Sequence, residues 1–177
     1  MRKVCFFRLL AVLSFFVCLA FAGCASYSAA HLKRNPWQVA PHQQLTSQTL
    51  NFIYTVEPSP EGGAGGGSLL KGSASPLPGS LPTWAAWFEQ GSIIVYVTDS
   101  TGRIAEEKLV EFLPQPVHEP LTFECSLDIP TSLDDRSYFV SFGYYLVATD
   151  LKPSDEDGAD QTLQPRKIIR HEGAYPE

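Results

Sequence analysis

The chain has 177 residues, of which 44% are hydrophobic and 18% charged, and its formal net charge is −6. This length and apolar content suit one folded domain with its own core, and they argue against a disordered polypeptide. Because nucleic-acid backbones repel an acidic protein, we expect no nucleic-acid partner.

The N-terminus combines basic residues, an apolar run over 9–21 and a cysteine preceded by two small residues, Ala22-Gly23-Cys24. This arrangement resembles the signal of bacterial lipoproteins. The resemblance implies a signal peptide over 1–23 and acyl chains on the thiol and amine of Cys24, which would hold the protein on a bilayer. The next residue is alanine rather than the aspartate that retains such proteins in the inner membrane. The resemblance therefore implies an outer-membrane anchor facing the periplasm.

Two other interpretations of the N-terminus stay open. Phe21 stands where lipoproteins usually carry leucine, and Ala20-Phe21-Ala22 fits the A-x-A pattern of ordinary signal peptidase. Cleavage there would free a soluble chain that starts at Gly23. The apolar run could instead remain as a membrane helix, although it would span only about 20 Å of a hydrocarbon core roughly 30 Å thick.

Charge and composition divide the rest of the chain. Cleavage before Cys24 removes three basic residues and leaves 10 basic and 19 acidic ones, a net charge of −9. The segment 24–47 contains two basic residues and no acidic one, and it lacks a hydrophobic period. We expect 24–47 to be a lipidated flexible tether, 48–170 to be the folded domain and 171–177 to be a frayed tail.

The first half of the domain predicts strands, a loop and one helix. Residues 49–57 alternate in polarity and predict a strand with one buried face, formed by Leu50, Phe52, Tyr54 and Val56. The glycine-rich stretch 62–67 predicts a mobile loop, and 69–75 a short edge strand. Residues 80–90 predict one short helix that ends at Gly91, with an aromatic strand as the alternative.

The second half predicts strands throughout. Residues 92–98 are β-branched and aromatic, and the turn 99–102 places Gly102 where a positive φ is needed. The segments 108–113 and 121–129 alternate in polarity, which is typical of strands with one wet face. Residues 138–149 are apolar on both faces and predict a central strand, and 162–170 predict the last strand.

The pattern predicts an all-β fold, a small antiparallel β-sandwich of about seven strands with one short helix. Residues 127–138 resemble the tyrosine corner of immunoglobulin-like domains, with Tyr138 as the corner tyrosine. The plan of anchor, tether and small β-domain resembles secretion-system pilotins and the transthyretin-like lipoprotein of type VI secretion. The segments 93–99, 123–127 and 138–145 carry this resemblance, which implies an interaction or assembly module.

Candidate sites are few. The aromatic group Trp84, Trp87 and Phe88 is the candidate partner-binding surface, with a lid over one end of the sandwich as the alternative. The acidic group Asp155, Asp157 and Asp160 is a weak candidate calcium site, with a solvated hairpin loop as the alternative.

No motif for catalysis or phosphate binding occurs in the sequence. Cys125 lies on the apolar side of its predicted strand, which favours a small buried side chain over a nucleophile. We therefore expect no enzyme and no cofactor. The expected role is a membrane-anchored module with a protein partner, and the alternative is a binding protein for a small apolar or glycan ligand.

Overall fold

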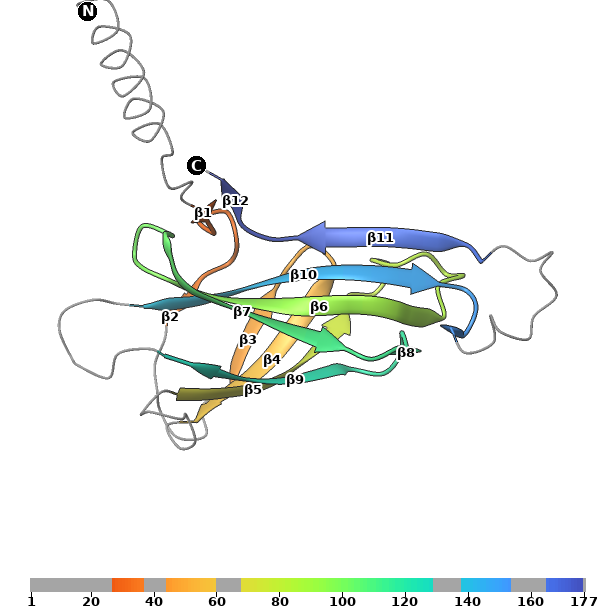
Figure 1. The fold of residues 1–177 in the computed structure, drawn as a ribbon, viewed down its shortest axis with the longest axis horizontal. Coiled ribbons are helices and arrows are strands. Elements are labelled where there is room, and N and C mark those ends of the chain that lie inside the picture. Colours follow the sequence, from red (N-terminus) through yellow and green to blue (C-terminus); the bar gives the residue numbers. More distant parts are fainter. Residues whose placement is uncertain (1–26, 37–43, 60–67, 129–137, 154–164, 177) are drawn as a thin grey trace, which may run out of the picture.

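The computed structural model describes residues 27–36, 44–59, 68–128, 138–153 and 165–176. In them the chain forms three antiparallel sheets, of which the two larger ones pack face to face and the third is the two-stranded ribbon β1-β12 (Figure 1). The larger sheet has the order β11-β10-β6-β7, with β2 paired to β10 and β8 to β6. The smaller sheet has the order β3-β4-β5-β9. The predicted all-β antiparallel sandwich is confirmed.

The described residues contain twelve strands, four of them only two residues long, so eight longer strands compare with the seven expected. The strands are β1 (Tyr27–Ser28), β2 (Asn35–Pro36), β3 (Leu45–Gln48), β4 (Phe52–Ser59), β5 (Ser68–Pro76), β6 (Trp87–Thr98), β7 (Ile104–Phe112), β8 (Gln115–Pro116), β9 (Leu121–Leu127), β10 (Phe139–Thr149), β11 (Lys167–Glu172) and β12 (Tyr175–Pro176).

Aromatic side chains fill the space between the two sheets. Tyr54 of β4 stacks on Phe142 of β10 with ring centroids 4.7 Å apart, and the Phe52 ring is tilted by 56° against the Tyr144 ring with centroids 4.9 Å apart. The Tyr54 hydroxyl donates to the backbone oxygen of Gly143 at 3.4 Å, and burial raises the pKa of Tyr54. Offset aromatic pairs of this kind add to the free energy gained from burial alone.

Polarity alternation predicted the buried faces of two strands well. Phe123 and Leu127 of β9 are buried, whereas Glu124 between them is exposed. In β4 the expected buried face is also confirmed, except that Leu50 is 77% exposed. Leu50 lies in the turn before the strand begins at Phe52, so the alternation does not extend to it.

The predicted helix over 80–90 is wrong. The backbone N–H of Ala85 donates to the carbonyl of Pro82 at 3.0 Å, which closes a turn, and the chain then enters β6 at Trp87. Helical spacing was misleading because pairing with β10 satisfies the backbone and buries Phe88 between the sheets. Gly91 ends no helix. A Cβ there would lie 2.4 Å from the Phe112 ring, so glycine allows that ring to cross the strand.

Strand positions within the sheets were predicted in part. The stretch expected as an edge strand, 69–75, is the interior strand β5, which pairs with β4 on one side and β9 on the other. β10 lies between β11 and β6, so the predicted central strand is confirmed. The turn residue Gly102 has a φ of 93°, as the turn sequence predicted. The glycine-rich loop and most of the tyrosine-corner stretch lie outside the described residues.

The outer face of the larger sheet is covered by both ends of the described chain. β1 pairs with β12, and Ala29 and Leu32 pack on Tyr96 of β6 as a second small core. Gly143 allows this cover, since a Cβ there would lie 2.6 Å from the Glu172 carbonyl oxygen. Parts of the expected tether and tail therefore form strands: β1, β2 and the start of β3 lie within 24–47, and the end of β11 and β12 lie within 171–177. The β1–β12 pair shields an apolar sheet face from water.

Truncating a central ring tests this account of the core. Phe142 is 1% exposed, so Phe142→Ala should lower the free energy of unfolding by about 3–5 kcal/mol, measured by urea denaturation. Leu113→Ala is the control, because Leu113 is 83% exposed, and its effect should stay within about 0.5 kcal/mol. Equal losses in the two variants would contradict the burial described here.

Candidate functional site

One end of the larger sheet gathers aromatic and charged side chains from segments far apart in the sequence. Trp87 of β6 pairs with Thr149 of β10, which in turn pairs with Lys167 of β11, so the three strands share one edge of the molecule. In Figure 1 this edge lies at the right. We call it the tryptophan end, and its residues are Trp84, Trp87, Glu89, Asp150, Lys152, Arg166 and Lys167.

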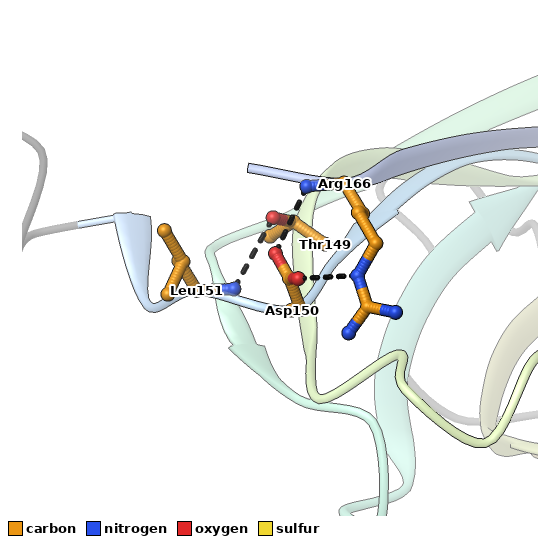
Figure 2. A network of polar contacts seen from close by, with 4 residues as sticks. All are labelled: Thr149, Asp150, Leu151 and Arg166. Atoms are coloured by element: carbon orange, nitrogen blue, oxygen red, sulfur yellow. Dashed lines mark hydrogen bonds and ion pairs between the residues drawn. The ribbon is translucent and has the colours of Figure 1, made fainter. Parts of the chain in front are cut away.

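Trp84 carries a cation on its ring. The guanidinium carbon of Arg166 lies 5.0 Å from the Trp84 ring centroid, within the range of a cation–π contact. Asp150 fixes this cation: its Oδ2 accepts from Nε of Arg166 at 2.7 Å, and its Oδ1 accepts from the Arg166 backbone N–H at 3.0 Å (Figure 2). These hydrogen bonds from Arg166 hold the pKa of Asp150 below its usual value. At neutral pH the carboxylate therefore stays charged and keeps the guanidinium against the ring.

The backbone beside this ion pair is fixed by Thr149. Its hydroxyl accepts from the backbone N–H of Leu151 at 3.3 Å, as Figure 2 shows, and its carbonyl accepts from Ala86 at 2.9 Å. Ala86 in turn accepts from the N–H of Val117 at 3.0 Å. The turn that contains Trp84 is thus tied to β8 and to the end of β10.

Trp87 has a second cation on its ring. The Lys152 ammonium lies 5.6 Å from the Trp87 ring centroid. Trp84 and Trp87 are both partly exposed, and Trp84 also packs against the main core. The two indoles therefore form a surface that is partly exposed to solvent and has a cation over each ring, rather than a purely apolar surface.

A β-bulge directs an acidic side chain to the same end. The pairing register of β6 with β10 shifts at Val147/Ala148. Because of this shift, Glu89 of β6 has no residue opposite it on β10. Glu89 Oε1 accepts from Lys167 Nζ at 2.8 Å, while Oε2 is buried with no hydrogen-bond partner in the described part of the chain. Bulges commonly re-aim side chains in this way beside functional sites.

The structure separates the three aromatic residues that the sequence grouped together. Phe88 is fully buried in the main core, so its proposed role in partner binding is corrected to a packing role. Trp87 and Phe88 are neighbours on a strand and point to opposite faces, whereas a helix would have placed them together. No sequence pattern indicated the cations, because Lys152 and Arg166 are distant along the chain from the indoles and meet them only through the pairing of the strands.

The other candidate sites lie outside the described residues. These are the lipid-attachment residue Cys24 and the acidic group Asp155, Asp157 and Asp160. Among the residues that are described, no group of three or more metal-ligating side chains occurs. In the same parts of the chain, no helix is long and apolar enough to cross a bilayer.

Comparison with known proteins found no matching family model, no significantly similar curated protein and no significantly similar solved structure.

Cys125 of β9 is half-buried against the main core and forms no disulfide. Burial raises the pKa of the Cys125 thiol to about 11, and the Glu106 carboxylate adds to this shift. Because the thiolate is the reactive form, such a thiol is a poor nucleophile at neutral pH.

This pKa gives a test of the β9 environment. At pH 8, alkylation of Cys125 should be about a hundredfold slower in the folded protein than in the urea-unfolded chain, because far less thiolate is present. The rate, followed by mass spectrometry of the Cys125 peptide, should keep rising up to a pH of about 11. A rate that levels off below pH 9 would contradict this assignment.

Proposed function

We propose that the protein is a non-enzymatic outer-membrane lipoprotein, acylated at Cys24, whose β-sandwich holds a protein partner at the periplasmic face of the membrane. The N-terminal sequence supports the anchor, through its basic start, its apolar run and Ala22-Gly23-Cys24. The tryptophan end supports the partner site. A role in a secretion or envelope complex follows from the resemblance to pilotins and transthyretin-like lipoproteins.

The single observation that carries the partner site is the pair of cation-capped indoles. Tryptophan and arginine are the side chains most enriched among residues that dominate binding energy at protein interfaces. Here Arg166 lies over Trp84 and Lys152 over Trp87, at ends of β6, β10 and β11, and a backbone hydrogen bond from Ala86 to Thr149 ties the Trp84 turn to β10. Such a surface is pre-organised, so a partner would lose little side-chain entropy by binding it.

The alternative, a carrier for an apolar ligand or a glycan, fits these contacts less well. A sugar stacks on an open indole face, but one face of each indole already carries a cation. Trp84 also packs against the main core, which reduces the indole surface left for a ligand. β11 supports a protein partner further, because it ends the described sheet and lies beside Arg166.

The anchor is tested by intact mass spectrometry of the mature protein from membranes. We expect a chain that begins at Cys24 and carries a diacylglyceryl group and an N-acyl chain, and that floats with membranes. Cys125→Ser should be modified in the same way, and Cys24→Ala should not. A mature chain that begins at Gly23 with an unmodified thiol would disprove the proposed anchor.

The partner site is tested by crosslinking and pull-down from membranes. Trp84→Ala/Trp87→Ala should weaken partner recovery in line with a loss of about 2 kcal/mol per dominant side chain, roughly 30-fold in affinity. Because Trp84 packs on the core, Lys152→Glu/Arg166→Glu is a second variant that keeps both rings and reverses their cations.

The matched control for these variants is Leu50→Ala/Leu109→Ala, which removes exposed apolar side chains away from the tryptophan end. It should recover partners at the wild-type level. Thermal unfolding of each variant separates loss of binding from loss of folding. Recovery of the same partners at the same level from all variants would overturn the proposed site.

A further inference from the structure

We propose that the surface formed by the β1–β12 ribbon and the turn at residues 99–103 lies against anionic lipid headgroups. The sandwich would then sit directly on the membrane in one orientation, instead of standing away from it on a free tether. This inference rests on the proposed acylation of Cys24.

The length of chain before the first described strand requires such proximity. Cys24 precedes Tyr27, the first residue of β1, by three residues. An extended chain advances at most about 3.5 Å per residue, so an acylated Cys24 would keep Tyr27 within about 10 Å of the headgroup region. The ribbon therefore cannot move far from the bilayer surface.

The segment that follows Tyr27 is attached to the sandwich by several contacts. Ala29 donates its N–H to the Gly102 carbonyl at 3.0 Å, and Nη1 of Arg34 donates to the Ser100 carbonyl at 2.8 Å. Leu32 is 4% exposed and packs in the small core around Tyr96. Because these contacts join the segment to the larger sheet, an anchor at Cys24 would orient the whole domain.

The exposed side chains of this surface suit a lipid interface. Tyr27 and Tyr175 are 52% and 57% exposed on the two strands of the ribbon, and tyrosine is enriched at membrane–water interfaces. Arg103, which pairs with Ser28 of β1, and Lys33 of the segment after β1 are also exposed. Each such cation favours an anionic leaflet by about fivefold.

Cations outnumber carboxylates at this surface. The segments 27–36 and 99–103 contain Lys33, Arg34 and Arg103 against a single acidic residue, Asp99. Asp99 accepts from Thr101 and from the Arg103 backbone N–H, which lowers its pKa, so its carboxylate keeps its charge. Glu107 of β7 pairs with Tyr96, outside these two segments. The described segment 27–36 itself contains two cations and no acidic residue, although the chain as a whole is acidic.

Such docking would leave the tryptophan end clear of the lipid contact. The ribbon and the 99–103 turn lie toward the left in Figure 1, and the tryptophan end lies at the opposite end of β6 and β10. The proposed partner site would then lie about 30 Å from the docked surface, measured along an eleven-residue strand.

Lysine footprinting of the full acylated protein on vesicles tests the orientation. The vesicles would contain about 30% phosphatidylglycerol in phosphatidylcholine, which provides the anionic surface. Acetylation of Lys33 should slow by about fivefold relative to detergent micelles. Lys71, on β5 of the smaller sheet, is the internal control and should change little.

Two charge reversals in the same part of the chain sharpen the test. Arg103→Glu, just before β7, should restore Lys33 acetylation on anionic vesicles, whereas Lys108→Glu, within β7 and outside the surface, should not. Parallel changes at Lys33 and Lys71 in a protein that floats with the vesicles would overturn the orientation and leave the anchor standing. A protein that does not float would overturn the proposed function, and this inference with it.

Discussion

The pairing of β6 with β10 runs from Trp87 opposite Thr149 to Thr98 opposite Phe139, and the other parts of the molecule depend on it. One face of this pair supplies the rings and aliphatic side chains that meet the smaller sheet. The other face is also apolar around Tyr96, so it needs a cover. Both requirements follow from strands that are hydrophobic on two sides, which is unusual for an antiparallel sheet with one face in water.

The cover comes from the two ends of the described chain. The segment 27–36 and the stretch 173–176 meet as β1 and β12 over the sheet, and Gly143 and Gly102 allow the close backbone approach that this needs. The Tyr96 hydroxyl accepts from the Ala174 N–H at 3.1 Å. The covering segments are therefore held by a hydrogen bond as well as by apolar packing. The described segment 27–36 is therefore part of the fold rather than a spacer, and the anchor that we propose at Cys24 would be coupled to the orientation of the sandwich.

The long strand pair also separates two chemically distinct ends. At one end, indole rings carry the cations of Arg166 and Lys152, and the Asp150 carboxylate holds one of these cations in place. At the other end, exposed tyrosines and basic side chains flank the residues nearest to Cys24. A protein built in this way can present one end to a lipid surface and the other to a partner, and our proposals depend on that separation.

Local pattern was enough to predict much of the sheet structure. Alternation identified the buried faces of β4 and β9, the doubly apolar run identified β10 as central, and turn chemistry identified the positive φ of Gly102. These features depend on neighbouring residues along the chain, since a strand shows its two faces directly in the period of its sequence.

Only the tertiary structure decided the start of β6, the interior position of β5 and the order of the terminal segments. Each depends on a strand distant in sequence: β10 takes Trp87 out of a helical pattern, β9 pairs with the free side of β5, and β12 holds β1. The same reason applies to the tryptophan end. The sequence alone determined that indoles occur at positions 84 and 87, but their cations reach them only when backbone hydrogen bonding brings β10 and β11 beside β6.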